Sequence, residues 1–182
     1  MFPQGAGGSF THFYPGTHHA IDLECPEGTP VLAMASGVVK EVRQTNTAGG
    51  IHARGLFDWN SCSLCAMRAV NQPARPPIHN LHAFQHCDNA QVTVLQGDGL
   101  LAEYVHILAG SALVKPGDRV AAGQELCSSG GAGFCPTPHL HLQLQEGESD
   151  TAPTVQFAML DCEGNPYFPV AGKWYGSQGE VP

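Results

Sequence analysis

One heptapeptide constrains this chain more than any other segment: PHLHLQL at residues 138–144. Leucines alternate with His139, His141 and Gln143, and successive side chains of a β-strand point to opposite faces. The pattern therefore predicts a strand with its leucines in the core and its two imidazoles together on the other face. Paired imidazoles suit a metal site. A half-buried strand with two exposed histidines would fit the heptapeptide alone equally well.

A second polar cluster lies far upstream, in HHAIDL at residues 18–23. Interpreted as a strand, this segment places His18 and Asp22 on one face. With His141 they form two imidazoles and one carboxylate, a donor set that catalytic zinc uses while keeping one position for water. His106 and His139 are further imidazoles, and either could take a proton or hydrogen-bond a developing oxyanion.

The remaining histidines are interpreted as ordinary polar side chains. His12 is the least secure of them, because it lies close upstream of Asp22 and could compete with His18 as a ligand. Strand parity predicts that His19 faces away from Asp22. The others in this group are His52, His79, His82 and His86.

Composition predicts a β-rich domain and limits the partners. The 182 residues suffice for one domain, or one domain with a large insertion, and 42% hydrophobic content supports a core. With 22 Gly and 14 Pro, short antiparallel strands and turns should dominate. A net charge of −8, with the eight Lys and Arg scattered, disfavours nucleic acid and anionic membranes as partners. No apolar run reaches the roughly 20 residues of a membrane span.

Seven cysteines favour an oxidising compartment, and we therefore expect an extracytoplasmic protein, periplasmic or secreted. The first residues lack the basic and apolar regions of a signal peptide, so none is expected in this chain. This fits either a cytosolic protein or a mature chain from which a signal peptide has been removed. Cys127 and Cys135 bracket a Gly-rich loop before the His139 strand, at a separation that a disulfide could close.

The alternating pattern breaks between residues 43 and 90. We interpret this stretch as an insertion in a domain at 18–182, which follows an N-terminal arm at 1–17. Cys62, Cys65 and Cys87 could bind a second zinc ion if one of the nearby histidines at 79, 82 or 86 completed the set. Disulfides or free thiols are the preferred interpretation, since the spacing fits no standard zinc finger.

Six short motifs follow one another in a fixed order along the chain. They are His18-x-x-x-Asp22, Gly28-Thr29-Pro30-Val31-Leu32-Ala33, Ser36-Gly37-Val38-Val39, Glu103-Tyr104-Val105-His106, Val114-x-x-Gly117-Asp118-x-Val120-x-x-Gly123-Gln124 and Pro138-His139-Leu140-His141. This ordered series resembles the lysostaphin-type, LytM-like and β-lytic zinc endopeptidases. The resemblance implies a small antiparallel β-sheet groove. It also implies zinc bound by His18, Asp22 and His141, with His106 and His139 as the catalytic pair.

The expected function is that of a monomeric zinc-dependent endopeptidase. By the same resemblance, its substrates are cross-bridges or stem peptides of bacterial peptidoglycan, or other Gly-rich peptides. Two alternatives of the same fold stay open: a non-catalytic module that regulates other wall hydrolases, and a latent enzyme whose insertion occupies the groove. Hydrolysis of an amide at a sugar–peptide junction is a further reaction that such a zinc site could perform.

Overall fold

The structure is a computed structural model that describes residues 12, 15–44, 90–133, 135, 137–149, 152–170, 174–176 and 179–181. Every secondary-structure element assigned within these ranges is a β-strand, and the strands pair in antiparallel fashion. The predicted antiparallel β-fold is thereby confirmed. A search of the described residues finds no helix long and apolar enough to cross a membrane.

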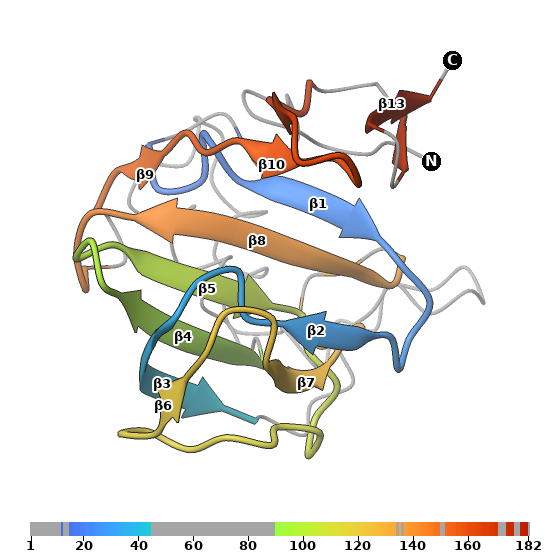
Figure 1. Cartoon of the computed structure of the whole chain (residues 1–182). Coiled ribbons are helices and arrows are strands. Elements are labelled where there is room, and N and C mark those ends of the chain that lie inside the picture. Colours follow the sequence, from blue (N-terminus) through green and yellow to red (C-terminus); the bar gives the residue numbers. More distant parts are fainter. Residues whose placement is uncertain are drawn as a thin grey trace, which may run out of the picture.

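A seven-stranded sheet forms the centre of the fold, with β8 (His139–Gln145) between β1 (Ile21–Glu24) and β5 (Leu101–Val105) (Figure 1). A short turn at Gly97-Asp98-Gly99 connects β4 (Gln91–Gln96) to β5. In spatial order the strands are β1 (Ile21–Glu24), β8 (His139–Gln145), β5 (Leu101–Val105), β4 (Gln91–Gln96), β3 (Gly37–Arg43) and β6 (Arg119–Val120), and β9 (Thr154–Val155) also pairs with β8.

Three two-stranded sheets accompany the central one. The first pairs β2 (Pro30–Leu32) with β7 (Glu125–Ser128), the second β10 (Met159–Leu160) with β11 (Pro166–Tyr167), and the third β12 (Trp174–Gly176) with β13 (Gly179–Val181). Figure 1 shows β2 and β7 in front of the central sheet. Buried side chains of both belong to one hydrophobic cluster, so the core lies between these two layers.

The apolar face of β8 supplies a large part of that core. Leu140, Leu142 and Leu144 are 9%, 6% and 6% exposed, as the alternation of the heptapeptide predicts. Tyr104 on β5 is also buried, and its hydroxyl accepts a hydrogen bond from the Met34 amide at 2.8 Å. The core therefore holds β8 so that its other face carries the polar side chains.

Two expectations about local structure were wrong. The strand predicted from His18 begins only at Ile21, since residues 15–19 form turns. The suggested bridge between Cys127 and Cys135 is not formed, because both are free thiols. Most of the predicted insertion, including Cys62, Cys65, Cys87 and the histidines within it, lies outside the described residues. The arm and domain boundaries stay predictions.

Candidate metal and catalytic site

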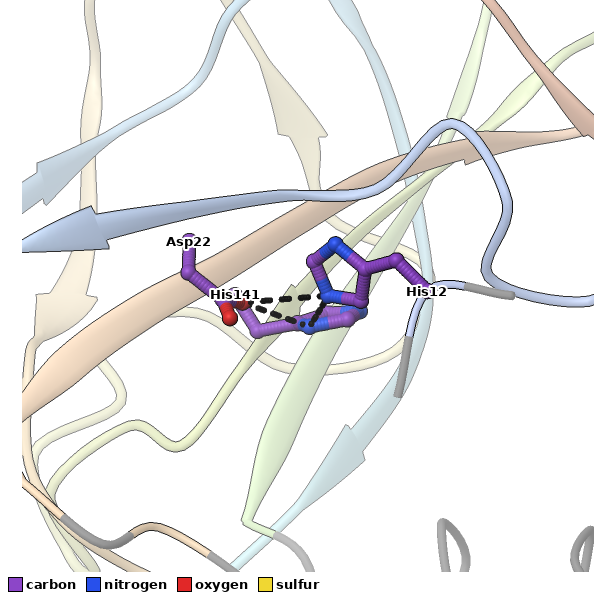
Figure 2. Close-up of side chains that lie close together, drawn as sticks. All are labelled: His12, Asp22 and His141. Atoms are coloured by element: carbon purple, nitrogen blue, oxygen red, sulfur yellow. Dashed lines mark hydrogen bonds and ion pairs between the residues drawn. The ribbon is translucent and has the colours of Figure 1, made fainter. Parts of the chain in front are cut away.

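Two side chains from the N-terminal region, His12 and Asp22, converge with His141 of β8 (Figure 2). Asp22 Oδ1 lies 3.0 Å from His141 Nδ1 and 3.4 Å from His12 Nε2. The two imidazole nitrogens are themselves 3.4 Å apart. Each residue thus offers one donor atom within 4.8 Å of the others, a spacing at which all three could bind a single metal ion.

Sheet register brings two of these donors together. Asp22 on β1 is directly opposite His141 on β8, and side chains directly opposite each other lie on the same face of a sheet. His12 belongs to the arm that precedes β1. The Pro15 carbonyl accepts hydrogen bonds from the Thr154 amide and hydroxyl, both at 3.0 Å, which attaches this arm to β9. His12 thereby contacts both Asp22 of β1 and His141 of β8.

The structure brings His12, and not His18, to Asp22 and His141. His12 is fully buried, whereas His18 is exposed and packs edge-on against His19, with ring centroids 4.7 Å apart. Strand parity does not apply to His18, because the chain turns before β1 begins. The sequence assigned the ligand role to His18 and kept His12 as a competitor, and which of the two binds a metal stays a prediction. The closeness of His12 to Asp22 in sequence is the signal that made it a competitor.

The charges within the cluster suit a cation. Burial alone would raise the pKa of Asp22, but hydrogen bonds from His12 and His141 outweigh it and hold that pKa well below its ordinary value. For His141, burial lowers the pKa, while the hydrogen bond and charge of Asp22 raise it, and the net shift is upward. A buried carboxylate that stays ionised and draws positive charge toward itself is a favourable ligand for a metal ion.

The two expected catalytic imidazoles lie beside this cluster. The ring centroids of His106 and His139 are 4.7 Å apart, and that of His106 is 6.0 Å from His141. His139 Nε2 is 3.6 Å from Asp22 Oδ1. All the histidines predicted for the site except His18 are therefore within one small region.

Backbone carbonyls orient both of these rings in the same way. His106 Nδ1 donates to the Ala132 carbonyl at 2.7 Å, and His139 Nδ1 donates to the Thr137 carbonyl, also at 2.7 Å. In a neutral imidazole, Nε2 is then the basic nitrogen. Burial, with the neighbouring His139 and His141, lowers the pKa of His106 to about 3. His106 is consequently neutral at ordinary pH.

The backbone of His106 is strained. Its φ of 64° lies in the left-handed region, which is uncommon for residues other than glycine. The Gly130 amide donates to the His106 carbonyl at 2.8 Å. A Cβ on Gly130 would lie 2.7 Å from Leu108 Cα, so only glycine permits this approach. The Gly-rich loop thus holds the His106 segment against the site.

These features define an antiparallel β-protein with a candidate mononuclear metal site flanked by two further imidazoles. The model of peptidase family M23 matches residues 80–153. The glycyl-glycine endopeptidase ALE-1 of Staphylococcus capitis is 27% identical over 129 residues, which are 70% of this chain. Through residues 80–153 the chain is similar to peptidase family M23, and over 129 residues it is similar to a glycyl-glycine endopeptidase.

Two solved structures are similar to this chain. The antimicrobial peptidase lysostaphin from Staphylococcus simulans aligns with a TM-score of 0.50 and 25% identity, over 85% of this chain and 47% of that one. A mutant catalytic domain of the prophage-encoded M23 protein EnpA from Enterococcus faecalis shares the fold, with a TM-score of 0.51, 23% identity, and 85% and 88% coverage. The match spans only 24% of the length of the curated endopeptidase.

Proposed function

We propose that the protein is a zinc-dependent endopeptidase that hydrolyses peptide bonds in bacterial peptidoglycan, in cross-bridges or stem peptides. The observation that carries this proposal is the convergence of His12, Asp22 and His141 beside His106 and His139, in a chain similar to a peptidase family. The relatives named glycyl-glycine endopeptidase and lysostaphin favour a Gly-rich peptide as substrate. We further propose that the protein acts outside the cytoplasm, where peptidoglycan lies, and that it acts as a monomer.

The donor atoms fit zinc in chemistry and spacing. Ligands bound at 2.0–2.2 Å to a tetrahedral zinc ion lie roughly 3.3–3.6 Å from one another. The three donor separations here are 3.0, 3.4 and 3.4 Å, close to that range. Two imidazoles and one carboxylate are also a usual protein set for catalytic zinc. When bound, zinc would polarise a scissile carbonyl and lower the pKa of a bound water toward neutrality.

Two imidazoles of the chain, His106 and His139, would then transfer the protons of the reaction. His106 and His139 each keep an Nε2 lone pair, because Nδ1 of each ring donates to a backbone carbonyl. Between them they can accept a proton from the attacking water and return one to the leaving amine nitrogen. Burial of His106 keeps it neutral before the reaction, as a proton acceptor must be.

Zinc content and cleavage assays test this function together. We expect about one zinc per chain, loss of turbidity in peptidoglycan suspensions, and cleavage of oligoglycine peptides that a chelator abolishes and added zinc restores. Zinc without cleavage of either substrate would favour the non-catalytic or latent alternative. A protein that binds no zinc would exclude the metallopeptidase proposal.

A matched pair of variants tests the third ligand. We expect His12→Ala to weaken zinc affinity by more than the roughly 10–100-fold that loss of an outer-shell partner costs. His18→Ala removes the same side chain six positions later from an exposed turn and should leave the affinity unchanged. The reverse result would assign the ligand role to His18, as the family spacing implies, and would mean that the arm rearranges around the metal.

A further inference from the structure

Gln143 follows His141 on the same face of β8 and is 5% exposed. Its side chain lies between two charged or chargeable groups. Gln143 Oε1 is 3.0 Å from His141 Nε2, and Gln143 Nε2 donates to Glu103 Oε2 at 2.8 Å. Glu103 on β5 is directly opposite Gln143 in the sheet register, so the pairing of β5 with β8 fixes this contact.

The carboxylate of Glu103 determines which way the Gln143 amide points. An ionised carboxylate only accepts hydrogen bonds, so the amide nitrogen must face Glu103 and the amide oxygen must face His141. An amide oxygen also only accepts, so His141 Nε2 must carry the proton at this contact. Without a metal, Nδ1 of His141 donates to Asp22; when metal binding releases that proton, the proton on Nε2 stays and Nδ1 is left with the lone pair.

His141 Nδ1 is the atom that faces the other donors, 3.0 Å from Asp22 Oδ1 and 3.4 Å from His12 Nε2. We propose that Glu103 and Gln143 form a positioning relay that fixes the tautomer and ring orientation of His141, so that the Nδ1 lone pair is presented to the metal. This inference rests on the proposed zinc site. Neither residue touches the metal position in the proposal, and each acts through His141.

The relay explains why an amide and a carboxylate are paired at these positions. If the amide were rotated, its NH₂ group would donate to His141 Nε2, and the ring proton would move to Nδ1, where it would face the cluster and block ligation. Outer-shell partners of a ligating histidine orient the ring and raise its basicity. Without Glu103, no charged acceptor would hold the Gln143 amide in the orientation that keeps the proton on Nε2.

Four variants separate this relay from general packing. Gln143→Leu removes the acceptor for His141 at similar volume, and we expect zinc affinity to fall roughly 10–100-fold. Glu103→Gln leaves the amide direction unfixed and should have a smaller effect in the same direction. The double variant Gln143→Glu/Glu103→Gln places the carboxylate next to His141 and the amide on β5. It should recover most of the wild-type affinity.

Gln91→Leu is the matched control. Gln91 on β4 is also a buried glutamine, and its amide nitrogen donates to Glu41 and Thr93 instead of a site residue. The same substitution there should leave zinc affinity unchanged. Thermal unfolding of the two leucine variants shows whether both remain folded, so that a loss of affinity in Gln143→Leu alone cannot come from unfolding.

Two measurements decide the outcome. Competition with a chromophoric chelator gives the zinc Kd, and ¹⁵N NMR of histidine-labelled, zinc-loaded protein shows which His141 ring nitrogen carries the proton. We expect Nε2–H in the wild type and in the double variant. Equal Kd values for the wild type and Gln143→Leu, or a double variant as weak as Gln143→Leu, would overturn the relay alone. A wild type that binds no zinc would instead overturn the proposed metal site.

Discussion

The two faces of β8 are equally buried but are held in different ways. Leu142 on one face is 6% exposed and packs in the hydrophobic core, while Gln143 on the other is 5% exposed and is hydrogen-bonded to His141 and Glu103. Packing of apolar side chains has no direction and depends on volume. Hydrogen bonds to buried polar groups are directional, and a buried donor or acceptor without its partner is costly.

The difference teaches where chemistry and stability are located in this fold. A change on the leucine face should lower the free energy of unfolding and leave the residues of the metal site in place. A change on the polar face should alter metal binding or catalysis while the core stays packed. The same strand thus contributes to core packing through one face and to the candidate site through the other, because successive side chains point to opposite faces.

The largest effect is expected from His141→Ala, on the polar face. This change removes one donor of the proposed metal site and also the hydrogen-bond partner of Asp22. We expect zinc to fall from about one per chain to none and hydrolysis to fall to background. Elemental analysis and the peptide cleavage assay measure both. A variant that still hydrolyses peptides would remove His141 from the metal site.

His106→Ala should separate catalysis from metal binding. His106 contacts His139 but is not among the three donors, so zinc content should stay at the wild-type level. Loss of a general acid–base group should lower kcat by roughly 10²–10⁴-fold. His19→Ala, outside the cluster, is the control and should be fully active. An active His106→Ala variant would exclude His106 from the reaction.

Leu142→Ala tests the apolar face. Leu142 is directly opposite Ile21 on β1 and Tyr104 on β5, so truncation leaves a cavity in the centre of the sheet. Such changes cost about 2–5 kcal/mol in the free energy of unfolding. Denaturant unfolding measures this loss, while zinc content below the midpoint should be unchanged. Loss of zinc from the folded variant would show that the two faces are not independent.

The smallest effect is expected on the free energy of unfolding at alkaline pH, from the buried Cys127 thiol in the hydrophobic core. Burial raises the pKa of the Cys127 thiol to about 12, from 9.0. Between these values the unfolded chain releases a proton that the folded chain keeps, so stability falls as pH rises. For this one group, the slope approaches about 1.4 kcal/mol per pH unit.

Cys127→Ala should make that decline shallower. Tyr104, whose pKa burial also raises to about 12, will retain part of it. Unfolding free energies measured under reductant between pH 8 and 11 give the slope. Cys162→Ala changes an exposed thiol and serves as the control. Identical slopes for the wild type and Cys127→Ala would mean that the Cys127 thiol ionises within the fold.

The sequence by itself determined the features that depend on local periodicity. Alternation at residues 138–144 was enough to predict a strand, with Leu140, Leu142 and Leu144 in the core and His139 and His141 on the other face. Turn residues and short alternating runs predicted antiparallel β-structure. These predictions succeeded because strand geometry relates each side chain to its neighbours in a fixed way.

Only the tertiary structure decided which imidazole of the N-terminal region meets Asp22 and which groups orient His141. Turns separate His12 and His18 from β1, and no periodic rule gives side-chain directions through a turn. The contact of Gln143 with Glu103 depends on the register between β8 and β5, which are far apart in the chain. Register and arm placement follow from packing of the whole domain, and a local pattern does not contain that information.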